Sequence, residues 1–242
     1  MHVRRWLLIL LWVISTCSQA QNAPPVPGNI MLVSEAWGDY TNADGSGLAW
    51  EVLRRVFEPA GITLQTRIEP YTRAVGLVQR GEVDGWVGSY RDEVQGVLYP
   101  HWHFDSDPIY ALGLATSPTP SAATLGDYRL AWVRGYKYEA YLPNVRRFNQ
   151  IQRRDGILPM LQHGRADFYI DALNEARYVL SQAADPSTFR LTHILDLPLY
   201  VGFADTERGR ALRAVFDQRM AVQVKSGELK PIFQHWKAPY PF

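Results

Sequence analysis

The feature that most constrains the fold of this chain is a sequence pattern that occurs twice. Residues 77–87 read LVQRGEVDGWV, and residues 160–170 read MLQHGRADFYI. Each copy is typical of a helix end, a glycine that terminates the helix, an aspartate and then an apolar strand. The two glycines, Gly81 and Gly164, lie 83 residues apart. Two similar α/β units at this spacing predict two lobes, because a solenoid needs at least three shorter repeats. The alternative is chance similarity between two helix–strand junctions.

The rest of the chain alternates helical and strand-like patterns. Apolar residues recur at helical spacing over residues 48–57, and Pro59 and Gly61 end the run. Residues 62–68 then alternate apolar and polar, as a half-buried strand does. This alternation predicts an α/β fold in which each lobe is a mainly parallel sheet flanked by helices. The linker composition of residues 117–123 indicates a boundary between the lobes.

The first twenty residues have the pattern of a secretory signal peptide. Arg4 and Arg5 precede an apolar run, and small residues of a cleavage motif follow at residues 18–20. The apolar run is too short to span a bilayer, which argues against the alternative of a retained anchor helix. We expect cleavage after Ala20 and a periplasmic location. A lipoprotein attached through Cys17 is the alternative.

The charges of the mature chain nearly cancel. The full sequence has 25 basic and 24 acidic residues, and the signal peptide removes only two arginines. This balance argues against nucleic acid or an anionic membrane as the main partner. The one cysteine, Cys17, lies in the signal peptide, so cleavage would exclude disulfides and thiolate metal sites. These observations favour a small molecule as the partner.

The sequence lacks the common motifs of catalysis. It has no G-x-S-x-G elbow, no H-E-x-x-H, no Walker loop and no G-x-G-x-x-G between a strand and a helix. We therefore expect no enzyme activity and no cofactor. The alternating His101, His103, Asp105 and Asp107 would share one face of an extended segment. The lack of cysteine and the break at Pro108 argue against a metal site there.

An ordered set of short motifs extends over nearly the whole mature chain. The first four are an aromatic loop EAWGDY (35–40), a DG before the first helix (44–45), the junction GEVD (81–84) and the segment FDSDPIY (104–110). They are followed by an opening L-G-D-Y…G (125–135), the junction GRAD (164–167) and a G…W ending (227–236). In this order the motifs resemble those of the bacterial extracellular solute-binding proteins of family 3, the type that binds amino acids.

The resemblance implies a type II periplasmic-binding-protein-like fold of two α/β lobes. Lobe 1 would comprise residues 29–113 and 202–242, and lobe 2 would comprise residues 114–201. Two crossover strands, near Ala111–Ala115 and Leu199–Ala204, would join the lobes, with the ligand held between them.

The resemblance also implies a function. A monomer would bind a small polar solute, amino-acid-like or carboxylate-bearing, and deliver it to an ABC-type importer. A protein that senses the same kind of ligand and signals to a membrane receptor is the alternative. A periplasmic enzyme is a further alternative.

Candidate ligand contacts in the first lobe follow the strand after Asp84. In the family, residues four to seven positions beyond this aspartate line the cleft, and here these positions are Gly88, Ser89, Tyr90 and Arg91. Ser89 and Arg91 are the candidate ligand contacts among them. Arg91 would bind a carboxylate with two hydrogen bonds. A surface pair with Asp92 or Glu93 is its alternative. The family's Ser/Thr-x-x-x-Arg is altered at this point, which puts the usual carboxylate clamp in doubt.

Further first-lobe candidates lie in two loops. Arg73 is a second candidate for an anion. The aromatic side chains would form walls against which a cation or planar group stacks. The aromatic candidates are Trp37, Tyr40 and Tyr71.

In the second lobe, Tyr136 and Lys137 occupy the place where the family has small hydroxyl residues. Lys137 would add a positive charge to a helix start, where backbone N–H groups favour an anion. Asp171 resembles the family's partner for an ammonium group, although it lies one position early. Asn174 and Glu175 are the alternatives for that role.

Overall fold

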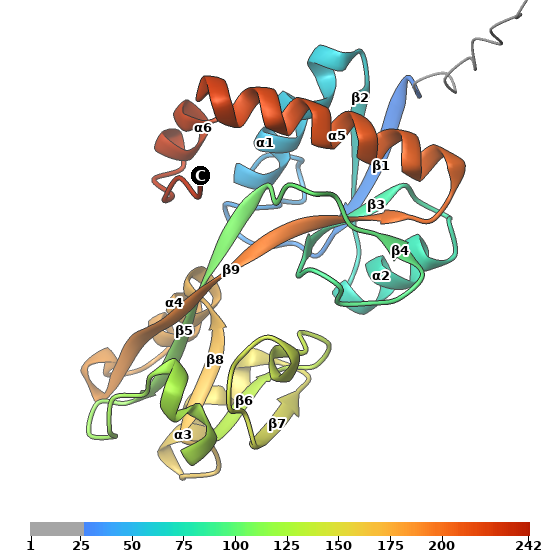
Figure 1. The fold of residues 1–242 in the computed structure, drawn as a ribbon. Helices are drawn as coiled ribbons and strands as arrows, with labels where there is room; N and C mark the ends of the chain where they lie inside the picture. Colours follow the sequence, from blue (N-terminus) through green and yellow to red (C-terminus); the bar gives the residue numbers. More distant parts are fainter. Residues whose placement is uncertain (1–26) are drawn as a thin grey trace, which may run out of the picture.

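The computed structural model describes residues 27–242, and its elements form two lobes (Figure 1). The predicted signal peptide, its cleavage site and Cys17 lie outside the described residues. Within residues 27–242, no helix combines the length and the apolar composition needed to cross a membrane.

The first lobe is built on a sheet with both parallel and antiparallel pairs. Strand β1 pairs in parallel with β2 and β3, and the end of the long strand β9 pairs antiparallel with β3 and β4. The strands are β1 (Asn29–Ser34), β2 (Thr63–Ile68), β3 (Gly85–Ser89), β4 (Val97–Leu98) and β9 (Phe189–Ala204).

Four helices accompany this sheet: α1 (Leu48–Phe57), α2 (Tyr71–Gln79), α5 (Glu207–Ser226) and α6 (Lys230–His235). The first of them occupies the residues that the apolar spacing predicts, and its apolar side chains are buried. A short 3₁₀ turn, Glu58–Ala60, follows α1, and Gly61 ends it with a φ of 76°. Burial of one apolar face therefore holds α1 against the rest of the lobe.

The second lobe has its own sheet. Strand β6 pairs in parallel with β7 and β8, and β5 pairs antiparallel with β8 and β9. The elements are β5 (Asp105–Leu114), β6 (Arg129–Val133), β7 (Arg147–Ile151), α3 (Ile157–Gln162), β8 (Phe168–Ala172) and α4 (Leu173–Ser181). Helix α4 packs beside β5 and β8.

The repeated junction has the same structure in both lobes. Gly81 and Gly164 follow α2 and α3 with φ values of 70° and 61°, a conformation that favours glycine. The next aspartate in each copy accepts a hydrogen bond from the backbone of the neighbouring strand. Asp84 accepts from the N–H of Met31 at 2.8 Å, and Asp167 accepts from that of Arg129 at 2.7 Å. The aspartate thus joins the start of one strand to the preceding parallel strand.

Strands β5 and β9 run side by side between the two lobes (Figure 1). Asp105–Leu114 pairs with Phe189–Leu199, and Tyr200–Ala204 pairs with the first sheet. The crossover expected at Ala111–Ala115 therefore lies earlier in the chain, because Ala111 pairs with Ile170 inside the second sheet. The bounds of the two lobes at residues 113 and 114 stay a prediction.

Candidate functional site

A cavity of about 190 Å³ lies between the lobes. Its first-lobe lining comes from the loop after β1, the start of α2 and the end of β3. Its second-lobe lining comes from the loop after β6 and from the start of α4. Residues 105–108 of β5 and residues 236–239 after α6 complete it. The cavity thus lies where both sheets meet the crossing strands, the usual position of a ligand in such folds.

Aromatic side chains form much of the wall. Seven of them line the cavity: Trp37, Tyr40, Tyr71, Tyr90, Tyr136, Tyr138 and Trp236. The ring centroids of Tyr71 and Tyr136 are 5.7 Å apart across the cleft, in an edge-to-face arrangement. Tyr90 likewise contacts Tyr138, with centroids 6.0 Å apart. Rings from both lobes therefore close around the same space.

Local backbone geometry positions the ring of Trp37. The Trp37 N–H donates to Thr41 Oγ1 at 3.2 Å, and this hydroxyl donates to the Glu35 carbonyl at 2.7 Å. Gly88 at the end of β3 has a φ of 89°, and a Cβ there would lie 2.7 Å from the Trp37 ring. Glycine at this position thus allows the indole to lie over the strand end.

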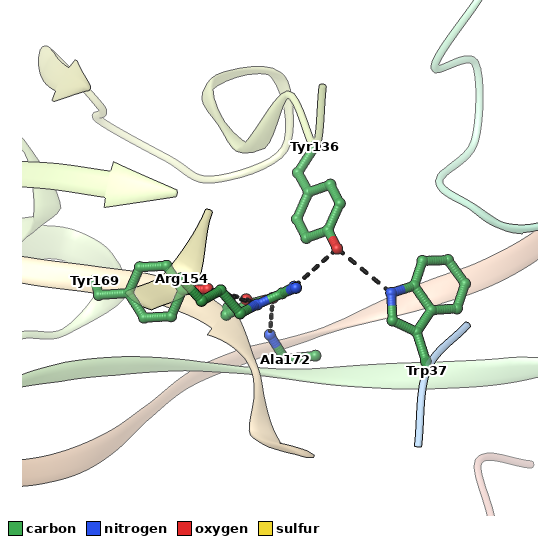
Figure 2. A network of polar contacts seen from close by, with 6 residues as sticks. Trp37, Tyr136, Arg154, Tyr169 and Ala172 are labelled. Carbon is green, nitrogen blue, oxygen red and sulfur yellow. Dashed lines mark hydrogen bonds and ion pairs between the residues drawn. The ribbon is translucent and has the colours of Figure 1, made fainter. Parts of the chain in front are cut away.

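A polar network connects the lobes beside the cavity (Figure 2). The Tyr136 hydroxyl accepts from the Trp37 indole N–H at 3.4 Å and from Arg154 Nη2 at 2.8 Å. Arg154 Nε also contacts Asp171 Oδ2 and the Tyr169 hydroxyl, each at 3.0 Å. The Tyr169 hydroxyl in turn donates to Asp171. The buried charge of Asp171 therefore has an internal cation and a hydroxyl as partners.

Three further carboxyl groups face the cavity and form no ion pair within residues 27–242. They belong to Asp105, Asp107 and Glu175. Burial raises the pKa of Asp105 to about 7 and that of Asp107 well above its usual range. Burial, together with the charge of Asp171, raises the pKa of Glu175 to about 7. The cavity therefore holds carboxyl groups that resist ionisation at neutral pH unless a positive charge joins them.

Five of the site residues expected from the sequence line this cavity: Trp37, Tyr40, Tyr71, Tyr136 and Asp171. Glu175 and Asn174, the alternatives for an ammonium partner, line it as well. The pocket lining does not include Arg73, Ser89, Arg91 or Lys137.

Arg91 makes its contacts away from the cavity. Its guanidinium donates to the carbonyls of Pro100 at 3.0 Å and His101 at 3.1 Å, and it lies 4.5 Å from the ring centroid of Tyr200. The backbone turns at Asp92, whose φ is 59°. The Arg91 side chain thus lies against the segment that contains Pro100 and His101.

The remaining two basic candidates also have protein partners. Arg73 pairs with Glu69 at 3.2 Å, and its side chain is 66% exposed. Lys137 donates from Nζ to the Glu93 carbonyl at 3.1 Å, which adds a second polar link between the lobes.

Glu93 explains the position of Ser89. Its carboxylate accepts from the Tyr71 hydroxyl at 2.6 Å, from Ser89 Oγ at 3.1 Å and from the Tyr90 N–H at 3.3 Å. These are the donors at the end of β3 and the start of α2. A carboxylate of the chain itself therefore takes the donors that sequence reasoning assigned to a ligand, and burial raises its pKa.

The lining side chains that sequence reasoning did not assign to a ligand include Asp105, Asp107 and Tyr138. Asp105 and Asp107 were considered only as metal ligands, and within residues 27–242 no group of three or more histidine or acidic side chains is arranged to hold a metal ion. Tyr90 is one of the cleft positions that the family resemblance implies, whereas Tyr138 had no signal beyond its position next to Lys137. The pairing of β5 with β9 brings the two aspartates to the cavity, and that pairing is set by the tertiary fold.

No protein-family model matches the sequence, and no curated protein matches it. Solved structures match its fold. A histidine kinase sensor domain with similarity to periplasmic binding proteins has a TM-score of 0.68 and 17% identity, over 87% of this chain and 96% of that chain. The substrate-binding protein of an ABC uptake transporter from Streptococcus pneumoniae, with bound histidine, has a TM-score of 0.65 and 17% identity, over 86% and 92%.

A third similar structure is an ancestral amino acid-binding protein described as a precursor of cyclohexadienyl dehydratase. Its TM-score is 0.63 at 12% identity, over 86% of this chain and 95% of that chain. Identities this low establish the fold alone. The chain therefore has the two-lobed, type II periplasmic-binding-protein-like α/β fold that its sequence motifs predict.

Proposed function

We propose that this chain is a periplasmic, monomeric solute-binding protein that encloses a small, amine-bearing solute between its lobes. The observation that carries the proposal is the cavity itself, because its lining comes from both lobes and from the two strands that join them. A ligand in this position would contact both lobes, so it would stabilise the closed arrangement by its differential affinity for that state.

Contacts between the lobes support closure around a ligand. Trp37 of the first lobe donates to Tyr136 of the second, and Lys137 of the second donates to the Glu93 carbonyl of the first. Each contact is a single hydrogen bond, worth about 0.5–1.5 kcal/mol net for the neutral Trp37–Tyr136 pair and about 1.5–3 kcal/mol for the charged Lys137 donor. Such small terms leave the opening and closing equilibrium within reach of ligand binding.

Delivery to an ABC-type importer is the role we favour, on the strength of the family resemblance. Signalling to a membrane receptor is the second candidate, and it uses the same cavity and the same closure. The two roles differ only in the protein that binds the closed form. Pull-down of the ligand-bound chain with a permease or with a receptor kinase therefore distinguishes them.

Catalysis is a third candidate, because Asp105 and Glu175 have pKa values of about 7, near those of working acid–base groups. Binding without turnover is the simpler function for carboxyl groups enclosed among tyrosines. Mass spectrometry of a ligand recovered after long incubation decides this point: a binding protein returns it unchanged.

A thermal-shift screen against amino acids, polyamines, sugars and organic acids tests the proposal. A ligand at 100 times its Kd adds about 2.7 kcal/mol to the unfolding free energy, which is a readily measured increase in Tm. Tyr136→Ala should weaken binding of the best ligand at least tenfold, because it removes a wall and a link between the lobes.

Tyr178→Ala is the matched control, since Tyr178 lies in the same lobe and is 61% exposed. It should bind as the parent does. A parent protein that responds to no class of solute, or equal losses in the two variants, would contradict the proposal.

A further inference from the structure

The charges around the cavity do not balance. Asp171 is paired with Arg154 at 3.0 Å and is 1% exposed, so its negative charge is already compensated. Among the described residues, Asp107 accepts a hydrogen bond only from the neutral Tyr90 hydroxyl, at 3.0 Å, and Asp105 accepts from the Ser106 N–H at 2.7 Å. Glu175 takes part in no ion pair among the described residues.

Basic groups do not offset these three carboxyls. Arg177 and Lys237 line the cavity, but both residues are exposed, so water screens their charges. Glu35, whose pKa is raised by burial, adds another carboxyl near Arg154 and Asp171. Around the enclosed part of the cavity, the uncompensated ionisable groups of the described residues are therefore acidic.

The aromatic wall is a second, independent feature of the same space. Tyr40 lines the cavity, and its buried hydroxyl has no hydrogen-bond partner in the described part of the chain. A buried hydroxyl without a partner costs free energy, which a bound ligand would relieve. Rings of Trp37, Tyr71 and Tyr90 also face the cavity, and aromatic faces attract organic cations.

A carboxylate on the ligand has no comparable partner. The guanidinium of Arg91 donates to two backbone carbonyls and lies over Tyr200, and Glu93 takes the donors at the end of β3. A ligand carboxylate in the enclosed part would lie among Asp105, Asp107 and Glu175, none of which offers it a positive charge, whereas a ligand cation there would favour the ionised form of these groups.

We propose that the ligand is an organic cation, an alkylammonium, quaternary ammonium or guanidinium group, held by Asp105, Asp107 and Glu175 within the aromatic wall, and that binding requires no carboxylate on the ligand. This inference rests on the proposed function, since it names the class of solute that the interlobe cavity takes. It replaces the amino-acid-like, carboxylate-bearing ligand expected from the sequence.

Isothermal titration with matched pairs tests the inference. The pairs are lysine and cadaverine, arginine and agmatine, and glycine betaine and choline, and the members of each pair differ mainly by a carboxylate. In at least one pair the member without the carboxylate should bind at least as tightly as its partner. Glutarate, a dicarboxylate with no amine, should not bind.

Variants locate the site of the cation. Asp107→Asn and Glu175→Gln should each weaken binding of the best cation about 10- to 100-fold, the loss expected for one charge-assisted contact. Asp196→Asn is the matched control, since Asp196 lies in the second lobe with its side chain 58% exposed. It should leave the affinity unchanged, as should Arg91→Ala. Circular dichroism of each variant confirms that it is folded.

The outcomes separate the inference from the proposed function. Tighter binding of the carboxylate member in every pair, or binding of glutarate, would overturn the inference and leave solute binding intact. Cation binding that is unchanged in both Asp107→Asn and Glu175→Gln would overturn it as well. A parent protein that binds no member of the pairs, glutarate or any solute of the broader screen would overturn both.

Discussion

Asp105 and Asp107 lie just before Pro108, in the part of β5 that lines the cavity. Asp105 is 5% exposed, and its carboxyl accepts a hydrogen bond from the uncharged Ser106 N–H. Burying a carboxyl group without a charged partner costs free energy in the absence of a ligand. Its position in the cavity indicates that the cost is tied to binding.

The pH dependence of stability follows from the direction of this pKa. The Asp105 pKa rises from 3.8 to about 7 in the fold, so between these values the folded state binds more protons than the unfolded state. The stability contribution of the protonated group is fully present below pH 4 and is lost as pH rises to about 7.

Asp105→Asn should therefore stabilise the ligand-free protein at pH 8, by up to about 4 kcal/mol. The gain should shrink steadily as pH falls from 7 toward 4. Urea unfolding of parent and variant at pH 8, 6 and 4.5 measures it. A variant that is less stable than the parent at pH 8 would show that Asp105 is ionised and well solvated.

Residue type predicted some of the site, and local backbone decided the rest. Trp37, Tyr40 and Tyr71 were predicted because their segments resemble first-lobe loops of the family and because aromatic rings can stack on a ligand. Arg91 was the main anion candidate. The residues next to it in the sequence do not indicate that the chain turns at Asp92, with a φ of 59°, or that the Glu93 carboxylate lies against the Tyr71 hydroxyl. A buried carboxylate that satisfies neighbouring donors is visible only in three dimensions.

Strand β9 is the element on which both lobes depend. Its first part pairs with β5, and its last residues pair with β3. Gly202 lies in that last part, and a Cβ there would approach the ring of Trp86 to 2.0 Å. Trp86 is fully buried in β3, so the ring cannot move aside without disturbing the core.

Gly202→Ala should accordingly lower the unfolding free energy by about 1–3 kcal/mol, the usual cost of overpacking. Gly156→Ala is the matched control, because nothing lies within 4 Å of its added Cβ and its backbone is not left-handed. The control should stay within about 0.5 kcal/mol of the parent. Similar midpoints for both variants in urea would contradict the packing of Trp86 on β9.

Elements with strong periodicity were predictable, and edge elements were not. The apolar spacing gave the bounds of α1, and the repeated junction gave the two glycine-terminated helices with their following strands. Strand β7 carries mostly exposed side chains, so it has no apolar alternation to read. The length of β9 was also missed, because its two parts pair with different sheets and differ in burial.

The whole molecule combines two sheets, a shared pair of strands and a cavity whose unpaired ionisable groups, in its enclosed part and among the described residues, are acidic. The two-lobed fold was predictable from the repeat and the ordered motifs. The acidic character of the cavity was not predictable from the sequence. It depends on which carboxyl groups lack a partner once Asp171 pairs with Arg154 and Glu93 binds its own neighbours.

Closure of the lobes on a solute is the central claim, and small-angle X-ray scattering tests it most directly. The radius of gyration is measured without ligand and with the tightest-binding cation of the matched pairs, at a concentration that calorimetry shows to be saturating. We predict a smaller radius of gyration with ligand, as the contacts of Trp37 with Tyr136 and of Lys137 with Glu93 form. An unchanged radius of gyration in a saturated sample would contradict closure.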